Sequence, residues 1–202
     1  MRLIGVLLFS VFCVASPSFA QGKDLLIDDF EGAITGGPEG TVDFGAGSGS
    51  TLDVTAAADI KNSGNQSIKA SFDAVSGGYM WIARGFGLDA KNTAWLVKPE
   101  DIDWSKYKGI SFYMYGSDSK TQVAFDVKDN TGELWRFITT DDFKGWKRII
   151  CPFSEFQVRG DWQPSSADKN GVLDFPLKSF QFEPRPVAKG VLYFDTVELV
   201  GK

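Results

Sequence analysis

Alternation of apolar and polar residues is the feature that most constrains how this chain can fold. From Ile68 onward it runs through short segments rich in aromatic and β-branched residues, each bounded by Gly, Asn, Asp or Pro. The segments are IKASF, GISFYMYG, TQVAFDVKD, ELWRFIT, WKRIICPF, KSFQFEP and VLYFDTVELV. Helical spacing is limited to a single predicted turn just after Phe153, whereas a parallel sheet needs helical crossovers. We therefore expect an all-β chain, a β-sandwich jelly roll with two antiparallel sheets.

The first twenty residues, MRLIGVLLFSVFCVASPSFA, have the pattern of a secretory signal peptide. One cation at Arg2 precedes an apolar run, and small residues follow up to a predicted cleavage site after Ala20. The run is shorter than the roughly 20 apolar residues that span a bilayer. Cys13 leaves a lipoprotein anchor as an alternative, but bulky Phe12 argues against it. We expect a secreted or periplasmic protein without a membrane span.

Residues 21–202 are predicted to form a single domain. Loss of Arg2 with the leader leaves 20 basic and 26 acidic residues, a net charge of −6. Nucleic acid is therefore a poor partner, and an uncharged ligand fits better. Cys151 is the one cysteine of this segment, so no internal disulfide can form. We interpret Cys151 as a buried apolar residue, and we expect stability to come from packing or from a bound ion.

The glycine-rich stretch 31–50, EGAITGGPEGTVDFGAGSGS, is predicted to be a long loop. Loops of that length in compact domains are usually functional or mobile, and the residues leave both possibilities open. Such a loop would be able to supply Asp43 or Phe44 to a ligand.

The stretch FDVKDNTGELWRF, residues 125–137, reads as a hairpin with a tight turn at Asn130 to Gly132. Strand side chains alternate, so Phe125 faces the core together with Val123 and Val127, and Asp126 faces outward. On the returning strand Trp135 points inward, and Arg136 shares the outer face with Asp126. A surface ion pair worth about 0–1 kcal/mol is one interpretation. One wall of a binding groove is the other.

Aromatic side chains on outer faces favour the groove. In GISFYMYG the inward set is apolar, which leaves Tyr113 and Tyr115 outside, on the same kind of face as Asp126 and Arg136. Flat rings stack on the apolar face of a sugar while charged groups hydrogen-bond its hydroxyls. We predict ligand-binding roles for Tyr113, Tyr115, Asp126 and Arg136, and we add Trp81 from MWIARGF.

Five segments together resemble family 11 carbohydrate-binding modules and the related complex I intermediate-associated protein domain. They are DLLIDDFEG, GNQSIKASF, DWSKYKGISFYMYGSDS, FKGWKRIICPFSEF and VLYFDTVEL. Both families are galactose-binding-like jelly rolls. The resemblance implies a concave sheet that binds a β-glucan or related polysaccharide, on which the outward Tyr, Asp and Arg positions correspond to the residues named above.

The resemblance also implies a structural calcium ion away from the sugar. The acidic end strands of the family match DDFE and FDTVE here, so the expected ligands are Glu31 and Asp195, with Asp29 as a further candidate. Carboxylate and carbonyl oxygens are the ligands calcium prefers. Two acidic residues at exposed strand ends, without an ion, remain the alternative.

The sequence gives little evidence for a catalytic site. The chain has no histidine, which excludes Ser-His-Asp and Cys-His machinery and histidine zinc sites. Glycoside hydrolysis needs two carboxylates across a cleft, and no strand carries acidic residues at alternate positions. Asp126 with Glu183 is the one pair left open. We predict a secreted, non-catalytic protein that binds polysaccharide. The alternative is an exported assembly protein that uses the same aromatic face for a protein partner.

Overall fold

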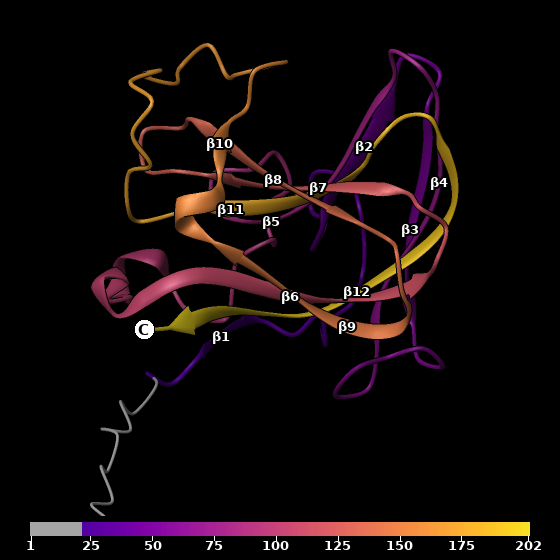
Figure 1. Ribbon diagram of the computed structural model, residues 1–202, viewed down its shortest axis with the longest axis horizontal. Coiled ribbons are helices and arrows are strands. Elements are labelled where there is room, and N and C mark those ends of the chain that lie inside the picture. The colour runs from indigo at the N-terminus through magenta and orange to yellow at the C-terminus, as the bar shows by residue number, and fades with distance from the viewer. Residues whose placement is uncertain (1–21) are drawn as a thin grey trace, which may run out of the picture.

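Two six-stranded antiparallel sheets lie face to face in the computed structural model, which describes residues 22–202 (Figure 1). The predicted leader lies outside these residues. The elements are β1 (Leu25–Asp28), β2 (Asp43–Gly47), β3 (Thr51–Ala57), β4 (Ser67–Ala74), β5 (Tyr79–Gly85), η1 (Pro99–Asp101), η2 (Trp104–Lys106), β6 (Tyr107–Ser117), β7 (Gln122–Lys128), β8 (Leu134–Thr140), β9 (Lys144–Pro152), η3 (Phe153–Glu155), β10 (Gln157–Val158), β11 (Ser179–Pro184) and β12 (Ala188–Gly201). The predicted antiparallel β-sandwich is confirmed. Among residues 22–202, no helix has the length and apolarity that crossing a membrane requires.

Sheet A has the order β3-β4-β12-β6-β9, with β1 also paired to β12. Strand β12 is long enough that β4 pairs with its first half and β1 with its second half, while β6 occupies its other edge. The two ends of the described chain therefore lie side by side (Figure 1). Sheet B has the order β10-β8-β7-β11-β5-β2.

Each segment predicted from alternation is a strand, and η3 supplies the predicted turn after the strand that ends at Pro152. The prediction of one continuous loop over residues 31–50 is wrong, because β2 lies within it and pairs with β5. The hydrophobic pattern missed this strand because three of its five residues, DFGAG, are glycine or alanine. Residues 43–47 form a strand because their backbone pairs with β5, and not because of their own strand propensity.

A layer of phenylalanines joins the two sheets. Phe112 of sheet A packs against Phe125 and Phe182 of sheet B, with ring centroids 4.8 and 5.0 Å apart. Phe182 in turn stacks on Phe194 of β12 at 4.1 Å. All four side chains are essentially inaccessible to water. Burial of Phe125 confirms the predicted inward face of β7.

The sulfur of Cys151 belongs to the same core. The side chain is fully buried in β9, as the sequence predicted for an apolar filler. Burial, with a smaller contribution from the charge of Glu155, raises the pKa of the thiol well above its usual value. The thiol is therefore protonated and unreactive at neutral pH.

We expect Phe112→Ala to lower the free energy of unfolding by about 3–5 kcal/mol, because the lost ring leaves a cavity between the sheets. Chemical denaturation monitored by far-UV circular dichroism measures this. Val187→Ala is the control, since Val187 is 81% exposed and its loss should change stability by less than about 0.5 kcal/mol. Equal effects of the two substitutions would contradict the assigned core.

Candidate functional site

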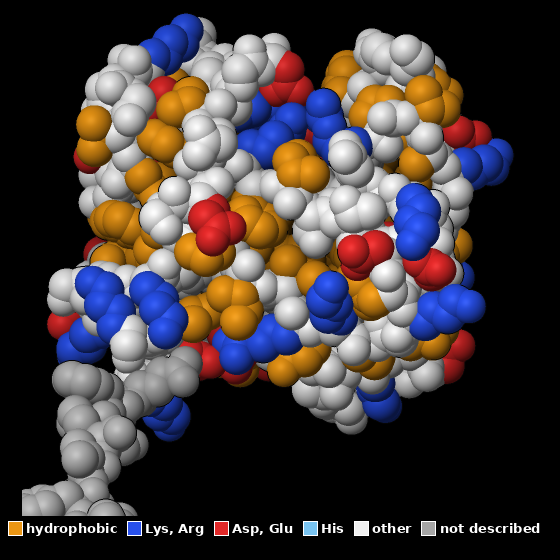
Figure 2. Space-filling view, viewed as in Figure 1, with side chains coloured by type: hydrophobic (Ala, Val, Ile, Leu, Met, Phe, Trp, Pro, Cys, Tyr) orange, Lys and Arg blue, Asp and Glu red, His pale blue; other side chains and the backbone are white. Residues whose placement is uncertain are grey.

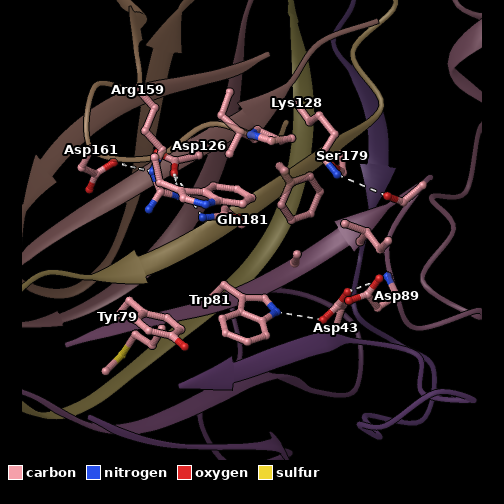
Figure 3. Close-up of a pocket in the computed structure, with 18 of the residues that line it drawn as sticks. Asp43, Tyr79, Trp81, Asp89, Asp126, Lys128, Arg159, Asp161, Ser179 and Gln181 are labelled. Atoms are coloured by element: carbon pink, nitrogen blue, oxygen red, sulfur yellow. Dashed lines mark hydrogen bonds and ion pairs between the residues drawn. The ribbon is translucent and has the colours of Figure 1, made fainter. Parts of the chain in front are cut away.

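The outer face of sheet B is hollowed into a cleft of about 780 Å³. Strands β2, β5, β7 and β11 supply its floor, and the segment 159–164 after β10 forms one side (Figure 3). Figure 2 shows a notch in the upper edge of the molecule, where this face of the sandwich lies, with basic side chains at its base. A concave, partly polar hollow of this size is the usual form of a small-ligand site.

Pairing registers bring the polar residues of the floor into one row across sheet B. Asp126 of β7 lies opposite Arg136 on one side and Gln181 on the other. The row continues through Ala83 of β5 to Asp43 of β2. Because Phe125 is buried between the sheets, its neighbour Asp126 must face the cleft. Alternation in four separate strands thus produces a single polar surface.

An ion network fills the floor around Asp126. Both of its carboxylate oxygens accept hydrogen bonds from Arg136, from Nε at 2.7 Å and from Nη2 at 2.8 Å. Arg159 Nη1 and Gln181 Nε2 each donate to Asp126 Oδ2 at 3.1 Å. Arg136 Nη2 also donates to Glu183 at 2.5 Å. Asp126 is completely buried and Glu183 is 2% exposed, so this is a buried network and not the exposed ion pair considered from the sequence.

Asp161 extends the network to the rim of the cleft. Its carboxylate accepts hydrogen bonds from Arg159 Nε at 2.7 Å and Arg136 Nη1 at 3.1 Å. Partial burial by itself raises the pKa of Asp161. The hydrogen bond from Arg159 and the charges of Arg136, Arg159 and Arg185 outweigh burial and lower that pKa to about 2. Asp161 is therefore an ionised acceptor, 45% exposed, at the edge of the cleft.

Aromatic rings line the cleft beside this network. Tyr79 and Trp81 of β5 have nearly parallel rings, with an interplanar angle of 14° and centroids 6.2 Å apart. Tyr79 is 51% exposed. On the opposite side, Trp162 is 57% exposed, and the guanidinium carbon of Arg159 lies 5.8 Å from the centroid of its ring. The cleft therefore offers ring faces on two sides of a charged centre.

Asp43 and Lys128 complete the far end of the cleft (Figure 3). Asp43 accepts the indole N–H of Trp81 at 2.8 Å and the backbone N–H of Asp89 at 2.9 Å. Lys128 Nζ donates to the carbonyl of Gly87 at 3.2 Å. Burial lowers the pKa of Lys128, although the nearby charges of Asp43 and Asp89 oppose this. This end of the cleft therefore contains both a carboxylate and an ammonium group.

Among the sequence-predicted residues, the structure brings together Trp81, Asp126 and Arg136. Trp81 and Asp126 line the cleft, and Arg136 lies beneath it, bonded to Asp126. Trp135 packs inward as predicted, with its indole N–H donating to Asp129.

The prediction that Tyr113 and Tyr115 share a groove with Asp126 is wrong. Both tyrosines belong to β6 of sheet A, whereas Asp126 belongs to β7 of sheet B, and the core separates the two outer faces. Tyr115 instead packs edge to face against Trp146 and Tyr193 on neighbouring strands of sheet A. Alternation shows which side chains face outward, but it does not say to which sheet a strand belongs.

Several residues of the cleft were missed from the sequence, and the most exposed or most strongly paired of them are Tyr79, Arg159, Asp161 and Trp162. Tyr79 had a usable signal, because it lies two positions before Trp81 and therefore on the same face. The other three lie in RGDW, which follows a strand of only two residues, and no periodicity extends that far.

The predicted calcium ligands converge in part. Asp195 Oδ2 accepts the backbone N–H groups of Asn62 and Ser63, at 2.8 and 3.1 Å. Glu31 accepts the backbone N–H of Asn65, so both carboxylates contact the loop 62–66. Asp29 instead accepts the N–H of Glu31 in its own turn. Within residues 22–202 no group of three or more Asp, Glu, Cys or His side chains is arranged around one point.

Asp195 has an unusual electrostatic setting. Burial raises its pKa, although hydrogen bonds from Ser63 and Asn62 oppose this. No Lys or Arg of residues 22–202 forms a salt bridge with it. Asp195 is thus a buried carboxylate that has no Lys or Arg partner among residues 22–202, and carboxylate oxygens are ligands of the kind that a hard cation takes.

Asp126 and Glu183, the carboxylate pair left open for catalysis, are bonded to the same guanidinium group. Arg136 contacts both, and Arg159 contacts both as well. Both carboxylates are buried and held by the same two arginines, so they do not face each other across open space in the cleft as the two carboxylates of a glycoside hydrolase do.

Solved structures with this fold include carbohydrate-binding modules. A family 11 module from Clostridium thermocellum, in complex with a β-1,3-1,4-mixed-linked tetrasaccharide, is 25% identical with a TM-score of 0.67, and the match covers 91% of this chain and 98% of that one. The family 11 module of the cellulosomal cellulase Lic26A-Cel5E from the same organism is 23% identical with a TM-score of 0.69 and has the same fold.

Among curated proteins, the chain is similar to endoglucanase H of Acetivibrio thermocellus, at 30% identity over 190 residues. The match covers 90% of this chain and 18% of that enzyme, so the chain spans about a fifth of the relative's length.

The sequence model that describes family 11 carbohydrate-binding domains matches residues 14–202. The match includes the segments that carried the resemblance, the two acidic end strands among them. With the sandwich fold and the cleft on sheet B, it gives one conclusion: the chain belongs to the carbohydrate-binding domains of family 11.

Proposed function

We propose that this chain is an exported, non-catalytic protein that binds a β-glucan chain in the cleft of sheet B. The observation that carries the proposal is that one cleft contains both a flat aromatic surface, formed by Tyr79 and Trp81, and a floor of charged side chains joined by ion pairs. Rings contact the apolar faces of pyranoses, and charged groups exchange hydrogen bonds with their hydroxyls. The solved relative bound to a mixed-linkage tetrasaccharide supports this ligand class.

The charge balance of the cleft favours a neutral ligand. Arg136 and Arg159 are each paired with carboxylates, so neither presents an unbalanced positive charge to an acidic sugar. Asp161, at the rim, accepts hydrogen bonds without needing a cation from the ligand. Because these groups already hold one another in place, the site is largely preformed and little side-chain entropy is lost on binding.

The concave shape of the cleft supports a sugar over a protein partner. A protein patch of similar composition is flatter and broader, whereas this hollow of about 780 Å³ lies between the aromatic strand β5 and the segment 159–164. We infer export to the periplasm or the medium, where polysaccharides occur, from the leader predicted at residues 1–20. The non-catalytic part of the proposal rests on the ion pairs that hold both Asp126 and Glu183.

Trp81→Ala should weaken binding of mixed-linkage β-glucan by at least about tenfold, because a large ring contact in the site is lost. Affinity electrophoresis and titration calorimetry measure this. Tyr115→Ala is the matched control: it removes a half-buried aromatic ring from sheet A and should leave affinity unchanged. Loss of binding in Tyr115→Ala alone would place the site on sheet A. Wild-type protein that binds no glucan, xyloglucan, cellulose derivative, mannan or starch would overturn the proposal and direct the search to a protein partner.

The contribution of Asp161 should not depend on pH over the mildly acidic range. Its pKa is lowered to about 2, so the carboxylate stays ionised as pH falls and is protonated only near that value. We expect the affinity ratio of wild type to Asp161→Asn to be constant from about pH 7 to about pH 4, well above the lowered pKa. Calorimetry at constant ionic strength checks this. A ratio that falls to one by about pH 5 would contradict the assigned environment.

A calcium ion is the second part of the proposal. Glu31 and Asp195 would supply carboxylate oxygens and the loop 62–66 would supply backbone carbonyls, linking the first strand to the last. Such an ion would compensate the buried charge of Asp195 and stabilise residues 22–202, in which Cys151 is free and no disulfide forms.

Excess calcium chloride should raise the melting temperature of the wild type above the value measured in chelator. A ligand that binds only the folded state stabilises it by about 2.7 kcal/mol when the ligand concentration is 100 times Kd. Asp195→Asn should abolish most of the shift. The control is Asp53→Asn, an exposed acidic residue on β3, which should keep it. Identical melting of the wild type in calcium and in chelator would refute the ion site.

A further inference from the structure

Strand β2 has an unusual composition for a strand that pairs with the ligand-facing β5. Its sequence is DFGAG, and the register sets Gly45 opposite Trp81 and Gly47 opposite Tyr79. Glycine in a strand costs stability because it loses more backbone entropy and contributes no packing. Two glycines placed opposite the two rings therefore need a compensating reason.

The space above these glycines is occupied by the rings. A Cβ atom at Gly45 would lie 2.6 Å from the indole of Trp81, and one at Gly47 would lie closer still to the ring of Tyr79. Contacts below 3.0 Å essentially do not occur at real Cβ atoms. Trp81 and Tyr79 therefore lie flat across the backbone of β2, in the volume that any larger residue would fill.

The two rings lie side by side rather than one above the other. They are two positions apart on one strand, which separates their attachment points by about 6.6 Å. The centroid distance of 6.2 Å and the angle of 14° match that spacing (Figure 3). The result is one nearly flat surface, two rings wide, at the side of the cleft. We call this surface the aromatic platform.

Asp43, at the start of β2, holds the indole in this orientation. One carboxylate oxygen accepts the Nε1–H of Trp81 at 2.8 Å. The other accepts the backbone N–H of Asp89 at 2.9 Å, which joins the strand to the loop at the end of the cleft. The residue thus fixes both the edge of the ring and the neighbouring loop.

We propose that Asp43, Gly45 and Gly47 are positioning residues for glycan binding: the glycines provide the flat seat of the aromatic platform, and Asp43 sets the orientation of Trp81. The proposal rests on the proposed function, because it assumes that the platform contacts the sugar. It predicts that changes in β2 alter affinity through Trp81 without disturbing the fold.

Gly45→Ala is the decisive variant. The φ angle of Gly45 is outside the left-handed region, so alanine can adopt the same backbone, but its methyl group displaces the indole. The control is Gly32→Ala, where a Cβ would meet no atom within 4 Å. Two readouts apply to each variant: the indole N–H resonance of Trp81, assigned by its disappearance in Trp81→Phe, and the affinity for a mixed-linkage β-glucan oligosaccharide.

We expect Gly45→Ala to shift the Trp81 indole resonance and to weaken binding by about tenfold, a loss equivalent to one good contact. Gly32→Ala should change neither readout. Circular dichroism should show both variants folded. A Gly45→Ala protein with the wild-type indole resonance and wild-type affinity would overturn the proposal.

Asp43 is tested by rescue. Asp43→Ala removes the acceptor, so the resonance of the Trp81 indole N–H should move upfield and the proton should exchange faster with solvent. The variant should bind glucan about tenfold more weakly, which is the scale of a lost hydrogen bond to a charged group. Asp43→Asn keeps one acceptor oxygen and should restore much of both readouts. Equal loss in the two variants would show that charge, not orientation, matters, and would overturn the role given to Asp43.

The indole readout needs no ligand, which separates the two proposals. If wild-type protein binds no glucan while Gly45→Ala and Asp43→Ala still move the Trp81 resonance, the positioning of the ring stands and the glycan function fails. If the wild type binds glucan but neither variant alters the resonance or the affinity, the function stands and the positioning proposal fails.

Discussion

Burial of phenylalanine between the two sheets is the constraint on which the rest of the structure depends. Phe112, Phe125, Phe182 and Phe194 pack ring to ring across the sandwich, and each is essentially inaccessible to water. Their burial decides which face of each strand turns outward. Asp126 faces the cleft because Phe125 cannot, and Gln181 follows from Phe180 and Phe182 in the same way. The core therefore determines the composition of the site on its far side.

The ion network explains how several charges can lie in the floor of a cleft without destabilising the sheet. Removing a single partner from a buried pair leaves an uncompensated charge, at a cost of about 3–5 kcal/mol. Here Asp126 has two arginine partners, and Arg136 has three carboxylate partners. The side chains hold one another, and Asp161 and Trp162 are the members of this cluster that stay exposed at the rim of the cleft. This balance of charge is one of the reasons for proposing a neutral ligand.

Backbone composition and side-chain chemistry cooperate on the aromatic side of the cleft. Glycines in β2 lower its strand propensity, which is why hydrophobic periodicity does not detect the strand. Those same glycines leave room for Trp81 and Tyr79 to lie flat, and Asp43 anchors the indole. Strand β2 has the local sequence of a loop and forms a strand because it pairs with β5. The glycines that weaken its strand propensity are the same residues that leave room for the aromatic platform.

The sequence by itself determined the fold class, the seven strands predicted from alternation and the β7-β8 hairpin with Asp126 opposite Arg136, because alternation and turn residues act over short distances. It also determined the family, because the quoted segments are specific together. Trp81, Asp126 and Arg136 were brought together as expected. Only the tertiary structure decided that Tyr113 and Tyr115 lie on the opposite sheet and that Arg159, Asp161 and Trp162 complete the cleft. The physical reason is that side-chain alternation reports inside from outside within one strand, whereas membership of a sheet depends on long-range hydrogen bonding between strands far apart in the chain.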